Sequence, residues 1–431
     1  MLRKIESDLV QWKQQKNHKP LILSGARQVG KTYSILQFAK KEYDSFIYIN
    51  FERDLDIKKV FSETANPTEI LMFLEARFAD VAFKENNLLI IMDEIQACPL
   101  ALTSIKFLGS ETSYDYILSG SLLGIAINHT SSYPVGYVES MEMVPMQFDE
   151  FLYANGVKES QILYIKECFQ SGKLVMEGIH KIFMDLFKAY LICGGMPEAV
   201  QTYCDTKNYA MVQKVQRQII DDYYRDMAKY AEPSDKIKTH DCFASIPEQL
   251  AKENKKFQYK LVRSGGNAAY FESSLQWLLD AGTIQKCYRL KTIAEPLKAY
   301  KETSIFKVYM ADTGLLISMF DHDTISKLLV NELGIYKGAI YENITAQILT
   351  ANQHDLYYFE PSSHSEIDFI LHTSKENIPI EVKSSTNTKA RSLKSYVEKY
   401  KPDIAYRFSM NNVNTEHEII KDYPLYMMMF I

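Results

Sequence analysis

The sequence predicts an α/β protein in which a parallel sheet is followed by a helical segment, a winged-helix-like middle segment and a smaller C-terminal α/β domain. Three patterns support this fold class. Short apolar runs alternate with helical stretches over residues 1–150, which is typical of a parallel sheet covered on both faces. Helical periodicity dominates from about 154 to 232, and strand patterns return between about 325 and 431.

Short apolar runs bounded by Gly, Asn, Ser or Asp define the expected strands of the first segment. These strands are residues 20–24, 45–50, 88–92 and 116–118. Beyond the helical segment we expect short helices, a strand-like stretch, a connecting strand with its helix, and four terminal strands. They are residues 246–254, 273–282, 283–290, about 304 to 321, 356–360, 366–371, 378–384 and 423–431.

Composition is that of an ordinary globular protein. Of 431 residues, 46% are hydrophobic and 24% charged, and 49 Lys and Arg against 54 Asp and Glu give a net charge of -5. We therefore do not expect a uniformly basic surface of the kind that binds nucleic acid. A local basic face is compatible with this net charge. The N-terminus lacks a signal-peptide core, no run is long enough to span a bilayer, and the six cysteines form no CxxC pair. We expect a soluble cytoplasmic protein that does not bind membranes.

A phosphate-binding loop is the clearest motif. Residues 25–32 read G-x-x-x-x-G-K-T, after an apolar strand and before a helical stretch. The loop residues expected to contact a nucleotide are Gly25, Ala26, Arg27, Gln28, Val29, Gly30, Lys31 and Thr32. Backbone N–H groups would surround the phosphates. Lys31 would reach the β- and γ-phosphates, and the Thr32 hydroxyl would ligate Mg²⁺.

Acidic and polar residues follow two of the expected strands. Asp93 and Glu94 come directly after the apolar run 88–92, at the strand end where α/β sheets bind ligands. Asp93 would hold Mg²⁺ through water, and Glu94 would orient or deprotonate the attacking water. The alternative is that this pair only begins a helix. Ser119 ends the next strand, where a hydroxyl could sense the γ-phosphate.

These motifs resemble the AAA+-type ATPases of bacteria and archaea in which a P-loop domain precedes a conserved C-terminal domain of unknown function. The resemblance covers essentially the whole chain. It rests on the segments SGARQVGKT, LLIIMDEIQACP, ILSGSLLG, SSYPVGYVESMEMVPMQFDEFL, CGGMPEAV, DDYYRDMAKY, IPEQLAKENKKFQYKLV, WLLDAG, FKVYMADTGLL and KGAIYEN. It implies ATP binding and slow hydrolysis. Self-association into a homo-oligomer is an expectation by analogy with AAA+ proteins.

A second group of charged residues lies near the C-terminus. Strand alternation separates Asp368 from Ile367 and Phe369, and it places Glu381 and Lys383 on one face of the next strand. The six residues between the two strands suit a hairpin that brings the charged faces together. Glu342 lies on a preceding helical stretch.

The pattern Asp368, then Glu381-x-Lys383, with the helical Glu342, resembles the PD-(D/E)XK nuclease fold. The resemblance implies that Asp368 and Glu381 bind Mg²⁺ or Mn²⁺ and that Lys383 and Glu342 complete a catalytic site. A non-cleaving binding or scaffold domain remains an alternative. So does a charged hairpin face with cross-strand ion pairs.

The expected domains are a P-loop ATPase core (1–153), a helical lid (154–232), a winged-helix-like segment with its connector (233–322) and a PD-(D/E)XK-like domain (323–431). Two basic runs could contact DNA. They comprise Lys252, Lys255, Lys256, Lys260 and Arg263, and then Lys389, Arg391, Lys394, Lys399 and Lys401. The leading hypothesis is an ATPase whose nucleotide state controls a metal-dependent nuclease-like or DNA-binding domain. The alternatives are an ATP switch that binds a protein partner and a DNA-binding regulator.

Overall fold

The computed structural model describes residues 2–85, 87–121, 133–321, 323–330, 332–334, 336–362, 365–383 and 391–431. The chain divides into two compact units. The first comprises residues 1–144 and 280–282, and the second comprises 145–279 and 283–431.

The first unit is built on a parallel sheet with strand order β2-β3-β4-β1-β5. The strands are β1 (Leu21–Ser24), β2 (Ser45–Asn50), β3 (Leu88–Asp93), β4 (Asp115–Ser119) and β5 (Glu139–Glu142). The helices are α1 (Lys4–Gln14), α2 (Lys31–Glu42), α3 (Leu55–Glu63), α4 (Pro67–Arg77) and α5 (Pro99–Glu111), with the 3₁₀ turn η1 (Ile95–Ala97). The predicted α/β fold class is confirmed.

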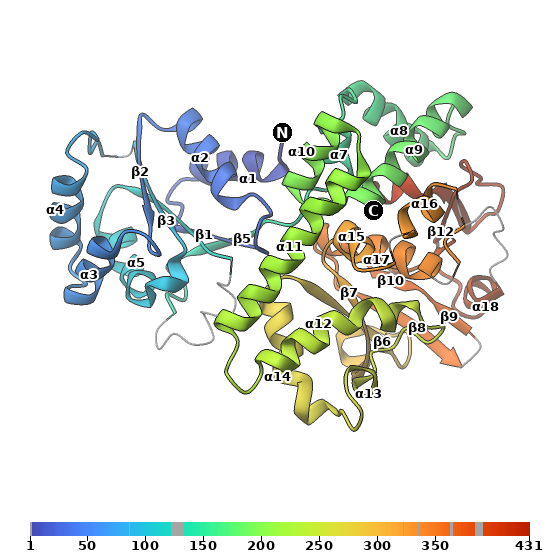
Figure 1. Ribbon diagram of the computed structural model, residues 1–431. Helices are drawn as coiled ribbons and strands as arrows, with labels where there is room; N and C mark the ends of the chain where they lie inside the picture. The colour runs from blue at the N-terminus through green and yellow to red at the C-terminus, as the bar shows by residue number, and fades with distance from the viewer. Residues whose placement is uncertain are drawn as a thin grey trace. The chain divides into compact units, whose positions relative to one another are not determined.

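Helices cover both faces of this sheet (Figure 1). Alternate residues of β2, β3 and β4 form one apolar core with α3, α4 and α5, and α2 packs against the opposite face. Strand β3 is buried along its whole length, as expected of a central strand in a two-sided sheet. The carboxyl end of β3 therefore delivers Asp93 and Glu94 from a rigid element.

Helices form the N-terminal part of the second unit. They are α7 (Phe148–Ala154), α8 (Glu159–Ser171), α9 (Glu177–Cys193), α10 (Pro197–Thr206), α11 (Tyr209–Tyr230), α12 (Lys236–Ala251), α13 (Tyr259–Val262) and α14 (Ala268–Asp280). Farther along lie α15 (Thr313–Ser318), α16 (Thr324–Leu329), α17 (Tyr336–Ala351) and α18 (Arg391–Tyr400). Helix α17 packs against strands of both sheets of this unit.

Two four-stranded mixed sheets complete this unit, in the orders β7-β6-β8-β9 and β10-β11-β12-β13. Their strands are β6 (Ile284–Leu290), β7 (Lys301–Met310), β8 (Tyr357–Ser362), β9 (Ser365–Ile367), β10 (Phe369–His372), β11 (Asn377–Val382), β12 (Ala405–Ser409) and β13 (Ile420–Pro424), with the 3₁₀ turns η2 (Leu297–Tyr300) and η3 (Leu425–Phe430). Strands β10 and β11 form the antiparallel hairpin that the sequence predicts.

Three details differ from the sequence expectations. The predicted strand 366–371 is interrupted at Asp368, so that β9 and β10 belong to different sheets. The predicted terminal strand 423–431 ends at Pro424 and continues as η3, because four consecutive residues from Leu425 are all buried, which an alternating strand does not favour. Strands β5 and β12 were not expected.

The strands of the segment predicted to be winged-helix-like are part of a larger sheet. Strands β6 and β7 pair antiparallel, as a wing would, but β6 also pairs in parallel with β8. The sheet therefore crosses residue 323, where the sequence predicted a domain boundary. The four-domain division itself stays a prediction. Among the described residues, no helix is long and apolar enough to cross a membrane.

Candidate nucleotide site and carboxylate cluster

The phosphate-binding loop joins the end of β1 to the first residue of α2. Gly25 has a φ of 135°, and a Cβ there would lie 2.2 Å from the backbone oxygen of Met143, so both conformation and space require glycine. Gln28 and Gly30 also have positive φ, and Gly30 directly precedes Lys31 at the start of α2. The loop thus leads into a helix N-terminus, the arrangement that binds phosphate in other proteins.

Lys31 lies within this loop with its side chain almost fully buried. Its Nζ donates hydrogen bonds of 2.8 Å to the backbone oxygens of both Gly25 and Ala26. Burial lowers the pKa of Lys31 to about 8, although Glu94 and Asp93 act in the opposite direction. The ammonium is therefore held inside the loop where the predicted phosphates would bind.

Asp93 is the centre of a hydrogen-bonded group at the carboxyl ends of the strands. Its Oδ2 accepts from the hydroxyls of Thr32 at 3.1 Å and Tyr48 at 2.7 Å. Its Oδ1 accepts from the Ser119 hydroxyl at 2.6 Å. The structure thus brings the predicted residues Thr32, Asp93 and Ser119 together. A hydroxyl beside a carboxylate is the oxygen donor pair that suits Mg²⁺.

Glu94 follows Asp93 in a left-handed backbone conformation, with a φ of 53°. Gln96 Nε2 donates a hydrogen bond to Glu94 Oε2. Burial raises the pKa of Glu94, and the hydrogen bond from Gln96 partly offsets that rise. Glu94 is thus a partly buried carboxylate next to the Asp93 group, as a base that activates water requires.

Sequence reasoning missed Tyr48 and Gln96 in this site. Tyr48 lies on β2, which pairs in parallel with β3, so the tyrosine reaches Asp93 only through the sheet register. Gln96 lies two residues after Glu94, and this spacing was the available signal for it.

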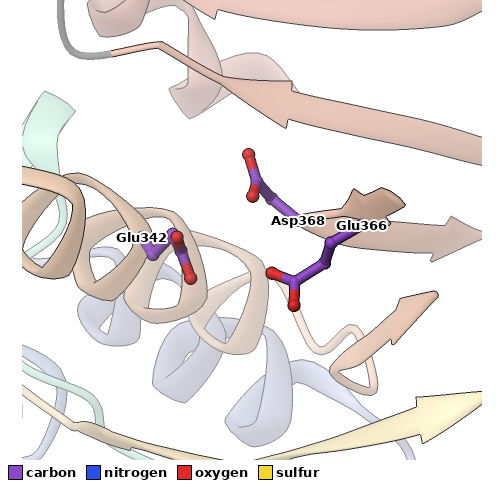
Figure 2. Close-up of side chains that lie close together, drawn as sticks. All are labelled: Glu342, Glu366 and Asp368. Atoms are coloured by element: carbon purple, nitrogen blue, oxygen red, sulfur yellow. The ribbon is translucent and has the colours of Figure 1, made fainter. Parts of the chain in front are cut away.

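In the second unit, three carboxylates converge from separate elements. Glu342 lies on α17, Glu366 on β9, and Asp368 between β9 and β10 (Figure 2). One oxygen atom from each lies within 4.8 Å of the others. Carboxylate oxygens at this spacing could surround one Mg²⁺ or Mn²⁺ ion.

Two lysines neutralise part of the negative charge of these carboxylates. Glu342 Oε1 accepts from Lys255 Nζ, and Glu342 Oε2 accepts from Lys307 Nζ at 3.0 Å and from the Tyr309 hydroxyl at 2.9 Å. Lys307 also donates to Glu366 Oε1 at 2.6 Å. Burial acts to raise the pKa of Glu342, but the two ammonium groups outweigh it and lower the pKa to about 2. Glu342 is therefore ionised.

The predicted Glu381 and Lys383 lie at the end of β11. Glu381 is 4% exposed, and Lys383 donates to its Oε1. Glu381 Oε2 is buried and has no hydrogen-bond partner among the residues that the structure describes. A buried, unpartnered carboxylate oxygen is costly unless a cation binds it, so this atom fits a metal ligand.

Asp368 is positioned by the same hairpin. Its Oδ2 accepts from the backbone N–H of Val382 at 2.8 Å. Burial raises the pKa of Asp368 well above its usual range, and the neighbouring carboxylates Glu381 and Glu342 raise it further. A bound divalent cation would favour the charged form of these carboxylates.

We define the carboxylate cluster as Glu342, Glu366, Asp368 and Glu381. Sequence reasoning missed Glu366, Lys307 and Tyr309, and it treated Lys255 only as a DNA contact. Two signals were present: Glu366 lies two residues before Asp368, and Lys307 interrupts an apolar strand. Of the other basic residues, Lys256 pairs with Glu360, and Lys389 lies outside the described residues.

Protein-family comparisons divide the chain into three matches. An AAA domain family matches residues 17–152. A domain of unknown function (DUF8612) matches residues 184–326, and another (DUF4143) matches residues 337–428. A comparison with curated proteins finds no match.

Similar solved structures include the Walker-type ATPase of Pyrococcus abyssi, at 13% identity and a TM-score of 0.42, covering 74% of this chain and 95% of that one. The Orc1 protein of Aeropyrum pernix in complex with DNA has 12% identity and a TM-score of 0.30, with 77% and 93% coverage. Cdc6p from Pyrobaculum aerophilum has 14% identity and a TM-score of 0.26, with 76% and 93% coverage.

The family match and the site geometry agree on the class of the first unit. Residues 17–152 are an AAA domain of the P-loop ATPase type, with the phosphate-binding loop and the Asp93–Glu94 pair at the carboxyl ends of its strands. The predicted ATPase class is thus confirmed for this part of the chain. The matches to residues 184–326 and 337–428 carry no assigned activity.

Proposed function

We propose that this protein hydrolyses ATP and that its nucleotide state controls a divalent-metal site in the carboxylate cluster that acts on nucleic acid. The observation that carries the ATPase part is the hydrogen bond between Thr32 and Asp93 beside the loop that holds Lys31. These groups belong to different elements, and a Mg²⁺–nucleotide complex needs both of them at one place.

The residues of the first unit have distinct roles in this proposal. Backbone N–H groups of residues 25–32 bind the phosphates, and Lys31 exchanges its carbonyl partners for phosphate oxygens. Thr32 and Asp93 hold Mg²⁺, which screens the phosphate charge when bound. Glu94 accepts a proton from the attacking water, and Ser119 and Tyr48 keep the Asp93 carboxylate in place.

Two variants test the ATPase part. We expect Lys31→Ala to lose ATP binding, because it removes the cation that faces the phosphates. We expect Glu94→Gln to bind ATP with unchanged affinity but to turn over at least about 100-fold more slowly, as loss of a general base does. Binding is measured with a fluorescent ATP analogue, and turnover by phosphate release. Unchanged nucleotide affinity in Lys31→Ala would contradict the P-loop assignment.

The carboxylate cluster supports the second part of the proposal. Asp368 and Glu381 would hold Mg²⁺ or Mn²⁺, with Glu342 and Glu366 alongside, and the bound ion would supply a Lewis acid at a phosphodiester. Lys383 Nζ, next to Glu381, would position or activate the water. The observation in favour of an ion is the buried Glu381 Oε2, for which the described part of the chain offers no hydrogen-bond partner.

Cleavage assays test this second part. We expect plasmid or single-stranded DNA to be cut in the presence of Mn²⁺ or Mg²⁺, and Lys383→Ala to lose that cleavage. Lys327→Ala, on α16 and outside both basic runs, serves as a control variant that keeps the cleavage. Absence of cleavage by the wild type with either ion, with and without ATP, would contradict the nuclease reading.

A second candidate function is an ATP switch that binds a protein partner, with the cluster as a silent scaffold. The ion pairs of Lys255, Lys307 and Lys383 with the cluster favour it, because they stabilise the carboxylates without any metal. The salt dependence of the affinity for DNA distinguishes the two candidate functions. DNA binding through phosphates weakens steeply as salt rises, whereas a protein-only switch has no DNA affinity. Sequence-selective binding without cleavage would instead indicate a DNA-binding regulator.

A further inference from the structure

Both oxygens of Glu342 already accept hydrogen bonds from the chain itself. Lys255 donates a hydrogen bond to Oε1, whereas Lys307 and Tyr309 donate hydrogen bonds to Oε2. A divalent cation binds carboxylate oxygens directly at close range. An ion that uses Glu342 as a ligand must therefore share its oxygens with these donors, and the ammonium charges of Lys255 and Lys307 oppose it at close range.

Of the two ammonium groups, that of Lys255 is the one that can leave. The Lys307 side chain is 0% exposed, lies on β7 and binds Glu366 as well as Glu342. The Lys255 side chain is 19% exposed, and its only carboxylate partner among the described residues is Glu342. Lys255 also lies between α12 and α13, outside any helix or named strand.

The helix that carries Glu342 leaves room for this lysine. Gly338 lies one turn before Glu342 on α17, and a Cβ at Gly338 would come within 3.1 Å of Lys255 Nζ. The lysine therefore reaches Glu342 across a position where any side chain would crowd it. Adjacent Lys256 binds Glu360 instead, at 2.7 Å, and Phe257 N–H donates to the Phe306 carbonyl of β7. These contacts hold the chain directly after Lys255 in place, and the Lys255 ammonium contacts Glu342.

We propose that Lys255 sets the metal affinity of the carboxylate cluster by competing with the divalent cation for Glu342. The inference rests on the proposed metal site of the same cluster. While the ammonium is bound, its positive charge and its hydrogen bond weaken coordination of the ion by Glu342, so the apparent dissociation constant is higher than it is when Lys255 has moved away. Lys255 comes from the segment matched by one family and Glu342 from the segment matched by another. The affinity for metal is thus controlled from outside the C-terminal match.

Titration calorimetry of the full chain with Mn²⁺ alone tests this proposal. Lys255→Met keeps the aliphatic stem and removes the ammonium, and we expect it to bind Mn²⁺ roughly tenfold more tightly than the wild type. Lys255→Arg keeps the charge and should stay close to wild type. Lys256→Met is the matched control, because it removes one positive charge from the adjacent residue without touching Glu342, and it too should stay close to wild type.

Specific outcomes overturn the inference. It fails if Lys255→Met binds Mn²⁺ no more tightly than wild type, or if Lys256→Met tightens binding equally, because net charge alone would then explain the effect. In either case, if Asp368→Asn loses the Mn²⁺ binding that the wild type shows, the proposal of a metal site in the cluster still stands and only the role of Lys255 is refuted. If neither the wild type nor Lys255→Met binds Mn²⁺ while circular dichroism shows both to be folded, the metal site fails and the inference with it.

Discussion

At the scale of single residues, Asp115 of the AAA domain joins side chains from three parts of the chain. Its Oδ1 pairs with His18 Nε2 at 2.8 Å, and its Oδ2 accepts from the Tyr43 hydroxyl at 2.7 Å. The His18 ring also packs edge-on against buried Trp12, at a centroid distance of 4.5 Å. The group therefore anchors the segment before β1 to the start of β4.

This group predicts a pH-dependent stability. The hydrogen bond from His18 to Asp115 raises the pKa of His18 above its usual 6.5, against a smaller opposing effect of burial. Because the folded pKa is the higher one, the stabilisation is fully present below about pH 6.5 and disappears as the pH rises through the folded pKa. We expect the free energy of unfolding to fall by about 1 kcal/mol across that window, the size of one charge-assisted hydrogen bond. Urea unfolding at several pH values measures it.

The control for this prediction is His18→Gln, which cannot titrate. In this variant the free energy of unfolding should no longer fall as the pH rises from about 6.5 through the folded pKa of His18. A wild type and a His18→Gln variant with the same slope of stability against pH would contradict the role assigned to His18.

At the scale of elements, the turn between α9 and α10 is tied to the start of α15 through Asp312. This buried carboxylate caps α15 by accepting from Leu315 N–H at 2.9 Å, and its other oxygen accepts from Gly195 N–H at 2.6 Å. Burial raises the pKa of Asp312 to about 6, although the backbone donors oppose the rise. One side chain therefore fixes two segments more than 100 residues apart in the sequence.

We expect Asp312→Ala to lower the free energy of unfolding by about 2 to 3 kcal/mol, because it removes a helix cap and leaves the buried Gly195 N–H without a partner. Asp312→Asn keeps an acceptor and should lose less. Thermal and urea unfolding of both variants measure the difference. Equal loss in the two variants would show that charge, and not the acceptor, is what the site needs.

Local patterns were sufficient to predict strands β1 to β4 and the nucleotide site of the first unit, but not the edge strand β5. The P-loop directly follows one strand, and the Asp93–Glu94 pair directly follows another. Because the carboxyl ends of parallel strands lie at one edge of a sheet, the meeting of Thr32 with Asp93 could be foreseen. The hairpin of β10 and β11 was equally predictable from its alternation and short turn.

The contacts of Lys255 and Lys307 with the carboxylate cluster could not be predicted in the same way. Lys255 and Glu342 are 87 residues apart, and their contact depends on how α12, β7 and α17 pack together. No periodicity within one element encodes such a contact. The interruption of the predicted strand at Asp368 likewise reflects the division of β9 and β10 between two sheets, which alternation alone cannot reveal.

At the scale of the whole molecule, the nucleotide site and the carboxylate cluster lie in different compact units. Control of one by the other requires that the two nucleotide states differ in their affinity for the second ligand. We expect Glu94→Gln with ATP to bind labelled duplex DNA with an affinity at least about fivefold different from that of the same variant with ADP, the lower end of typical coupling. Fluorescence anisotropy measures both affinities.

Lys31→Ala is the control for this coupling, because without bound nucleotide its DNA affinity should not respond to ATP or ADP. Identical affinities of Glu94→Gln in the two nucleotide states would contradict nucleotide control. The two sites would then be independent activities on one chain.

The sheet β7-β6-β8-β9 has a consequence for how this chain could have arisen. Strands β6 and β7 come from the segment matched by one family, and β8 and β9 from the segment matched by another. Since β6 pairs directly with β8, from Tyr288–Tyr357 to Leu290–Phe359, a cut between the two segments would leave both with an open strand edge. Recombination that moved only the C-terminal segment into another protein would thus carry a half-sheet and a Glu342 without its lysines. The two segments are expected to be inherited as a single module.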